Sequence, residues 1–246
     1  MSRRPGERVA DMPLHVEQFR YGHDNLGYLI FGGTEAMAVD GGAWQEILEF
    51  VSGRKLTLLY VTHTHRHHDH IEGSEPLLAR SGARILGFDE LQDGAAIALD
   101  GEPVRVYRTP GHSIDSVCFH AGRYLLSGDT LFNGTIGNCF SGNLRAFYES
   151  LRRLMALPED TVVFPGHDYV ELAVAFARYL EPENRSVDAY MSNYEPDCVR
   201  SLLRDEFKVN PYMRFNEPKL IEILKKRGLP VDTEWERWQS LMAIEE

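Results

Sequence analysis

The chain has 246 residues, of which 43% are hydrophobic, and a formal net charge of −11. This length suits one large domain, or one domain with an appendage, and allows a buried core without disulfides. The negative charge argues against a broad basic surface for nucleic acid. No apolar run reaches the roughly 18 residues that a membrane span needs.

The cysteine pattern favours a reducing compartment. Cys118, Cys139 and Cys198 lie far apart, are odd in number and form no C-x-x-C pair. The first 15 residues contain two neighbouring arginines but no apolar stretch after them. We therefore expect neither a secretory leader nor a twin-arginine leader, and a cytoplasmic location.

Short apolar segments separated by turns fill the first two-thirds of the chain. Gly32-Gly33 separates two of them and favours a hairpin. Helical patterns fall between other segments, and Pro76 suits the first turn of one of these helices. The mixture predicts an α/β or α+β layered domain. The expected strands are 14–20, 27–31, 36–40, 57–61, 83–87, 104–108, 115–120, 123–127 and 161–164, and the expected helices are 43–52, 75–81 and 144–156.

The composition changes after about residue 170, where helical patterns punctuated by prolines replace the strands. No strand pattern is visible in this last part of the sequence. We therefore expect one domain at 1–170 and an all-helical C-terminal subdomain at 171–246 packed against it. The expected helices are 171–180, 183–192, 196–206, 217–227 and 233–243.

A cluster of metal-binding side chains follows the apolar run 58–61. Residues 65–70 have the pattern H-x-H-x-D-H, which is formed by His65, His67, Asp69 and His70. Imidazole nitrogens together with a carboxylate suit zinc, iron or manganese. A carboxylate next to a histidine also allows one short loop to supply ligands to two metal ions.

Three further candidate ligands each follow a glycine shortly after a predicted strand. His112 lies in T-P-G-H-S, Asp129 in S-G-D-T and His167 in F-P-G-H-D-Y. Glycine permits a tight turn and a close approach of the backbone. A metal site needs ligands that converge from distant parts of the chain, and these positions meet that need.

These motifs, in this order, resemble the metallo-β-lactamase fold superfamily, and Asp40 in V-D-G resembles an earlier aspartate motif of that superfamily. Within the superfamily the chain is most similar to glyoxalase II, the hydroxyacylglutathione hydrolase family. The resemblance implies an αββα sandwich with a helical C-terminal subdomain. It rests on GDTLF at 128–132, PGHDY at 165–169, FARYLEPEN at 176–184 and NPYMR at 210–214.

The resemblance further implies a centre with two divalent metal ions, zinc as the first expectation and iron or manganese as alternatives. One site would use His65, His67 and His112. The other would use Asp69, His70 and His167, and Asp129 would bridge the two. Asp40 becomes a candidate partner for one of the ligand histidines.

The resemblance also implies a reaction. A hydroxide that bridges the metals would attack the carbonyl of a small-molecule thioester or related ester. Asp69 would bind metal and orient the hydroxide, which makes it the candidate catalytic residue. A thiolate is a good leaving group, so the reaction needs no strong general acid.

The chain departs from glyoxalase II where that family binds glutathione. Asn138 and Phe140 stand where the family usually has a basic residue and a tyrosine, whereas Tyr169 matches the family tyrosine. These three residues are the candidate substrate contacts. Since a charge-assisted bond to a carboxylate contributes about 1.5–3 kcal/mol, we expect weak recognition of glutathione or a different thioester or ester.

Two other hypotheses for the function remain open. Persulfide dioxygenases share the fold and use a single iron, although their usual Arg-x-Asp string is absent here. A non-catalytic, metal-stabilised binding module is the third reading, and the complete ligand set argues against it. The sequence does not indicate an oligomeric state.

Overall fold

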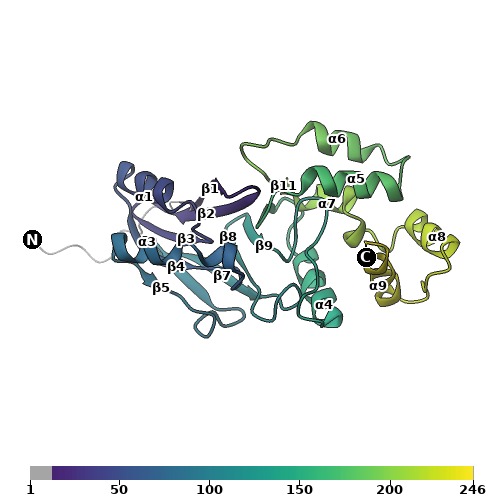
Figure 1. The fold of residues 1–246 in the computed structure, drawn as a ribbon, viewed down its shortest axis with the longest axis horizontal. Coiled ribbons are helices and arrows are strands. Elements are labelled where there is room, and N and C mark those ends of the chain that lie inside the picture. The colour runs from purple at the N-terminus through teal and green to yellow at the C-terminus, as the bar shows by residue number, and fades with distance from the viewer. Residues whose placement is uncertain (1–12, 246) are drawn as a thin grey trace, which may run out of the picture.

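The computed structural model describes residues 13–245, which form two mixed β-sheets with helices around them (Figure 1). The first sheet has the strand order β1-β2-β3-β4-β5 and the second has the order β11-β10-β9-β8-β7-β6. The strands of the first sheet are β1 (His15–Tyr21), β2 (Asn25–Phe31), β3 (Glu35–Val39), β4 (Thr57–Thr62) and β5 (Arg84–Ile85). Those of the second are β6 (Ala96–Leu99), β7 (Glu102–Arg108), β8 (Val117–Ala121), β9 (Tyr124–Gly128), β10 (Val162–Pro165) and β11 (Ser201–Leu202).

Strands β2 and β3 of the first sheet are buried on both faces. All seven residues of β2 are buried, and its large apolar side chains alternate between two apolar clusters as the two-residue period of a strand requires. Tyr28 and Ile30 face the second sheet. Leu29 and Phe31 face the helices α1 (Trp44–Gly53) and α3 (Ser74–Ser81), together with Ile47.

The second sheet repeats this arrangement. Phe119 and Leu126 point toward the first sheet. Cys118 and Leu125 point to the opposite face, where they pack in one cluster with Phe147 of α4 (Leu144–Met155). The layers are therefore helices, sheet, sheet and helices, and the expected αββα sandwich is confirmed.

The helices of the last third gather at the end of the molecule that carries β11, away from α1 and α3 (Figure 1). Within the residues that the structure describes, no helix is long and apolar enough to cross a membrane. The helices are α5 (Val170–Leu180), α6 (Ser186–Ser192), α7 (Leu203–Val209), α8 (Pro218–Lys226) and α9 (Glu234–Glu245), with a 3₁₀ turn at Pro211–Met213.

The expectation that the last third contains no strand was wrong. Residues 196–206 were expected to form one helix, but β11 pairs with β10 in antiparallel register, with Val163 opposite Ser201, and α7 begins only at Leu203. A strand of two residues is too short to show an alternating pattern, and its pairing with β10 is a tertiary interaction. The division at residue 170 stays a prediction.

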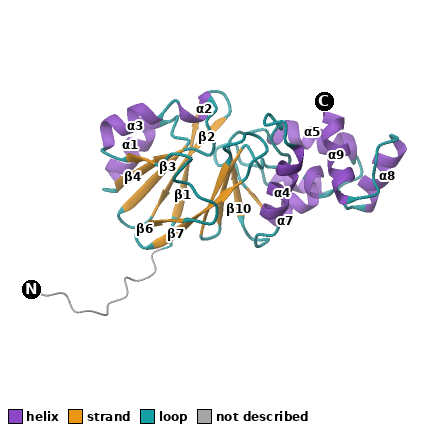
Figure 2. Ribbon diagram, turned by 90° about the horizontal axis from the view of Figure 1, so that it is seen from below, coloured by secondary structure: helices purple, strands orange, loops and turns teal. Residues whose placement is uncertain are grey.

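Two other short elements were also missed. The sequence predicted neither β6 nor α2 (His68–Ile71), which is a single turn of four residues. Figure 2 shows α2 at one edge of the two sheets, where the loops after several strands also lie. Four loops at this edge carry the candidate metal ligands: those that follow β4, β7, β9 and β10.

Candidate metal centre

The H-x-H-x-D-H segment spans the loop after β4 and the single turn of α2. His65 and His67 lie in the loop, and Asp69 and His70 lie in the helical turn. His65 and His70 are buried, whereas the side chain of Asp69 is 44% exposed. Because the backbone changes from an extended loop to a helical turn, this short segment can direct side chains to two separate ligand groups.

One group of ligand atoms contains His65, His67, His112 and Asp129. Nδ1 of His67 lies 2.8 Å from Nε2 of His65 and 3.1 Å from Nε2 of His112. Asp129 Oδ2 lies 3.4 Å from Nε2 of His112 and 3.8 Å from Nε2 of His65. Three imidazole nitrogens and a carboxylate oxygen thus surround one point, which is the donor set of a four-coordinate metal.

A second group contains Asp69, His70 and His167. The Nε2 atoms of the two histidines are 3.2 Å apart, and Asp69 Oδ2 lies 3.4 Å from Nε2 of His167. Asp129 also reaches this group, since its Oδ1 is 3.5 Å from His70 and its Oδ2 is 3.5 Å from His167. The Asp129 carboxylate therefore lies between the two groups.

Asp129 provides a test of whether these residues fit metal ions. Its Oδ1 is buried and accepts no hydrogen bond from any described residue. Buried polar atoms are nearly always paired, so an unpaired carboxylate oxygen amid imidazole nitrogens needs an explanation. A bound cation supplies one, and the residues present fit a pair of divalent ions.

Burial and neighbouring charges control the protonation of this cluster. Burial alone would raise the pKa of Asp129, but the neighbouring His70 above all holds it below its usual range. Burial lowers the pKa of His65 to about 3, so this imidazole is neutral near pH 7. An ionised carboxylate and a neutral imidazole are the forms that bind divalent metals.

Two glycines allow the close packing around Asp129. A Cβ on Gly166 would lie 2.1 Å from Asp129 Oδ1, and one on Gly137 would lie 2.0 Å from the Asp129 backbone carbonyl oxygen. Contacts this short are not tolerated, so any larger residue would displace either the carboxylate or a loop. This explains why glycine precedes His167 in the sequence.

Asp40 is buried directly behind the first loop. Its carboxylate accepts hydrogen bonds from the backbone N–H of Thr64 at 2.8 Å and from the Thr64 hydroxyl at 2.7 Å. It also pairs with Nδ1 of His70 at 3.0 Å, which turns Nε2 of that ring toward the ligand cluster. Asp40 has a φ of 52°, a conformation that aspartate and asparagine tolerate better than most residues.

Sequence reasoning missed two residues, Asp24 in the turn between β1 and β2 and Asn25 at the start of β2. Asp24 Oδ1 accepts a hydrogen bond from Nδ1 of His167 at 3.1 Å. The Asn25 side-chain amide donates to Asp69 Oδ2 at 2.9 Å. No motif spacing indicates them, because an acidic residue and an amide are also ordinary turn residues.

The three candidate substrate contacts lie beside the ligand histidines. The Phe140 ring is 67% exposed and lies with its centroid 5.2 Å from that of His112. Tyr169 stacks on His167, and burial, with the Asp24 carboxylate, raises its pKa to about 12, so its hydroxyl stays protonated. Asn138 contributes its backbone carbonyl, which accepts a hydrogen bond from Nδ1 of His112 at 3.0 Å, while its side chain is exposed.

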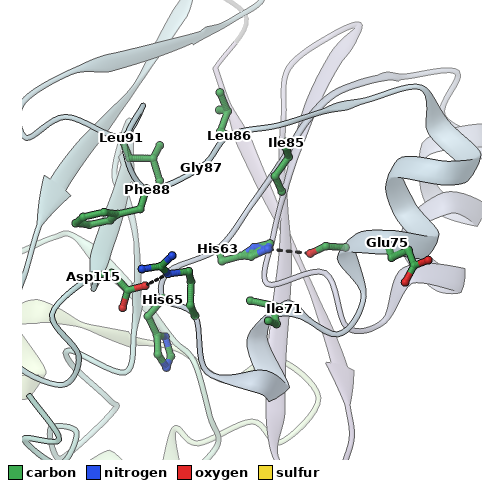
Figure 3. Close-up of a pocket in the computed structure, with 12 residues that line it drawn as sticks. His63, His65, Ile71, Glu75, Ile85, Leu86, Gly87, Phe88, Leu91 and Asp115 are labelled. Carbon is green, nitrogen blue, oxygen red and sulfur yellow. Dashed lines mark hydrogen bonds and ion pairs between the residues drawn. The ribbon is translucent and has the colours of Figure 1, made fainter.

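His63 and His68, which lie outside the motif, belong to neither ligand group. His68 is exposed, and Nε2 of His63 pairs with the Ser74 hydroxyl at 2.8 Å. His63 lines a cavity of about 360 Å³ whose walls include Leu86 and Phe88. Figure 3 shows the His65 ring pointing away from these apolar side chains, so this cavity lies behind the ligand loop.

Two family models and a set of curated relatives match the chain. The model of the metallo-β-lactamase superfamily matches residues 82–167, and the model of the hydroxyacylglutathione hydrolase C-terminus matches residues 168–243. The hydroxyacylglutathione hydrolase of Chromohalobacter salexigens is 32% identical over 79% of this chain and 83% of its own length. The chain belongs to the hydroxyacylglutathione hydrolase family.

A second curated relative and a solved structure are also similar to this chain. The hydroxyacylglutathione hydrolase of Rhodospirillum rubrum is 32% identical over 87% of this chain and 92% of its own length. Among solved structures, ETHE1 from Myxococcus xanthus superposes with a TM-score of 0.65 at 25% identity, covering 92% of this chain and 99% of that one. The junction between the regions matched by the two family models lies just after His167.

Proposed function

We propose that this protein is a metal-dependent hydrolase of a small-molecule thioester or a related ester. The observation that carries the proposal is the pair of ligand groups that meet at the Asp129 carboxylate. The names of the curated relatives support the thioester class, because hydroxyacylglutathione is a thioester. The net charge of −11 favours a small molecule over a nucleic acid, and three free cysteines favour the cytoplasm.

In this proposal His65, His67 and His112 hold one divalent ion, Asp69, His70 and His167 hold the other, and Asp129 binds both. Zinc is the first choice, and iron and manganese suit the same nitrogen and oxygen donors. When bound, such ions lower the pKa of water and polarise a carbonyl oxygen.

Asp69 is the proposed catalytic residue. Its side chain is 44% exposed, so its carboxylate is within reach of solvent and substrate. The Asn25 amide holds its Oδ2, which leaves Oδ1 to accept a hydrogen bond from the attacking water and orient it. The thiol that leaves has an ordinary pKa of about 8.5, so no buried general acid is required.

Phe140, Tyr169 and Asn138 are the proposed substrate contacts. The exposed Phe140 ring lies beside His67 and His112 and offers an apolar surface to the acyl or thiol part of the substrate. Tyr169 offers a protonated hydroxyl as a hydrogen-bond donor. Since Asn138 carries no charge for a substrate carboxylate, we propose that glutathione is recognised weakly or replaced by another thiol.

The test is a panel of thioesters and lactones, with S-lactoylglutathione included, assayed on protein whose metal content has been measured. We expect hydrolysis of at least one thioester, its loss on chelation, and a kcat/KM for S-lactoylglutathione below about 10⁶ M⁻¹ s⁻¹. Protein with two metals per chain that hydrolyses none of the panel would refute the proposal. One iron per chain with oxygen consumption on a persulfide would replace it with the dioxygenase reading.

A further inference from the structure

Residues 21–25 include the end of β1, the turn and the start of β2. Within the part of the chain that the structure describes, their side chains make hydrogen bonds to the second ligand group and none to the first. Asp24 holds the Nδ1 side of His167 at 3.1 Å, and Asn25 holds Oδ2 of Asp69 at 2.9 Å. Just before the turn, the Tyr21 hydroxyl donates to the backbone carbonyl of Asp69 at 2.8 Å. Two of the three ligands that belong to this group alone are therefore oriented by one segment of five residues, 21–25.

Backbone hydrogen bonds fix the turn in place. The N–H of Leu26 donates to the Gly166 carbonyl at 2.9 Å, and the N–H of Asp168 donates to the Asp24 carbonyl at 2.9 Å. Asn25 and His167 face each other across an antiparallel bridge. The side chains of Asp24 and Asn25 thus start from a backbone that is in register with the His167 loop, so their contacts are set by the fold.

The first ligand group is supported by uncharged partners instead. The Nδ1 atom of His112 faces the carbonyl oxygen of Asn138 at 3.0 Å, and that of His65 faces the Thr64 hydroxyl at 3.1 Å. In the second group both histidines face carboxylates, His167 facing Asp24 and His70 facing Asp40. Among the described residues, no side-chain hydrogen bond or ion pair joins Asp24 or Asn25 to His65, His67 or His112.

We propose that Asp24 and Asn25 are positioning residues that set the affinity of the second metal site, and so decide whether the protein holds one metal ion or two. The Asp24 carboxylate accepts the hydrogen bond from Nδ1 of His167, which leaves the Nε2 lone pair of that ring for the metal. Asn25 directs Oδ2 of Asp69 toward the same point. The inference rests on the proposed two-metal centre and explains how its second half is maintained.

The experiment titrates metal-free protein with zinc(II) in competition with a chromophoric chelator. The wild type should bind two zinc ions. Asp24→Ala and Asn25→Leu should each weaken the second ion by about 10- to 100-fold and leave the first unchanged. Asp24→Asn keeps an acceptor but loses the charge, so it should weaken the second ion less than Asp24→Ala does. Because asparagine has nearly the same shape as aspartate, it should also disturb folding less than alanine.

His23→Ala is the matched control, because His23 lies in the same turn with a side chain that is 98% exposed. Its Nδ1 lies 3.7 Å from Asp24 Oδ2, whereas Oδ1 is the oxygen that meets His167. It should bind both zinc ions with wild-type affinity. Two double variants locate the effect. Asp24→Ala combined with His167→Ala should bind zinc as His167→Ala alone does. Asp24→Ala combined with His112→Ala should bind its remaining zinc ion more weakly than His112→Ala alone.

Equal weakening of both ions in Asp24→Ala and Asn25→Leu would overturn the inference, since the turn would then support the whole fold rather than one site. Wild-type affinity for both ions in these variants would overturn it as well. A wild type that binds only one zinc ion is a different outcome, because it would refute the two-metal centre itself.

Discussion

Gly166 lies so close to Asp129 that a Cβ on the glycine would stand 2.1 Å from the Oδ1 atom of the carboxylate. The same Cβ would be 3.0 Å from Cε1 of His70. The residue before the ligand His167 therefore has its side-chain volume limited by two other candidate ligands. This relationship links the loops after β9 and β10 to the helical turn α2.

Gly166→Ala should displace the Asp129 carboxylate and lower the metal content of the purified protein, because a methyl group cannot share that space. The melting temperature should fall as well. Gly53→Ala is the control, since a Cβ on Gly53 meets no atom within 4 Å. Metal analysis and thermal unfolding are the measurements, and wild-type metal content in Gly166→Ala would contradict the geometry.

Asp129→Ala should remove more bound metal than His112→Ala or His167→Ala, because it alone reaches both ligand groups. Each histidine variant should lose chiefly one ion, while the Asp129 variant should weaken both. Elemental analysis of the three proteins, prepared in parallel, distinguishes these cases. If Asp129→Ala kept the metal content of the wild type, the bridging role would be refuted.

Asp40→Ala should lower the free energy of unfolding by about 3–5 kcal/mol, because it leaves the buried N–H of Thr64 and the buried ring of His70 without their acceptor. Asp40→Asn should cost clearly less, since asparagine retains an acceptor and tolerates the φ of 52°. Urea unfolding of the two metal-free variants is the measurement. Equal losses would show that neither the acceptor nor the backbone conformation matters.

Glu206 should make stability depend on pH. It is fully buried, and burial raises its pKa despite hydrogen bonds from the Tyr190 hydroxyl at 2.6 Å and the Gly134 N–H at 2.8 Å. The folded protein therefore keeps this proton to a higher pH than the unfolded chain does. Its contribution to stability is complete below the unfolded pKa of about 4.3 and declines as the pH rises through the folded pKa.

Glu206→Gln removes this titration, so the stability of the variant relative to the wild type should improve as the pH rises above the unfolded pKa of about 4.3. Urea unfolding at several pH values gives the difference directly. Because the metal ligands titrate in both proteins, their effects cancel in the comparison. A difference that does not change with pH would mean that Glu206 stays ionised in the folded state.

Phe140→Ala should raise the KM for a thioester several-fold while changing stability by less than about 0.5 kcal/mol, because the ring is 67% exposed yet lies against His67 and His112. Tyr179→Ala provides the control, since this ring is 63% exposed in the last turn of α5. Steady-state kinetics and thermal unfolding are the measurements. An unchanged KM in Phe140→Ala would remove this ring from the substrate site.

The candidate ligands could be read from the sequence because their chemistry is local. Histidine and aspartate at fixed spacing, or directly after a glycine, can be recognised as candidate metal ligands without knowledge of the fold. The alternation within β2 and the apolar faces of α4 are also encoded over short distances, which is why the layered fold could be expected. The resemblance to a known family added the assignment of ligands to two groups.

Elements that depend on distant partners could not be read in this way. The two-residue strand β11 exists because β10 offers it an unpaired edge, so residues 196–206 were wrongly expected to be one helix. The single turn of α2 is also too short to leave a periodic signal.

The sequence by itself determined the chemistry of the ligands and the layered fold, because both follow from residue types over short spans of chain. Only the tertiary structure decided which groups support those ligands. Asp24 lies 143 positions from His167, and Asn25 lies 44 from Asp69. Such pairs meet through strand pairing and loop packing, and neither interaction leaves a pattern in the residues themselves.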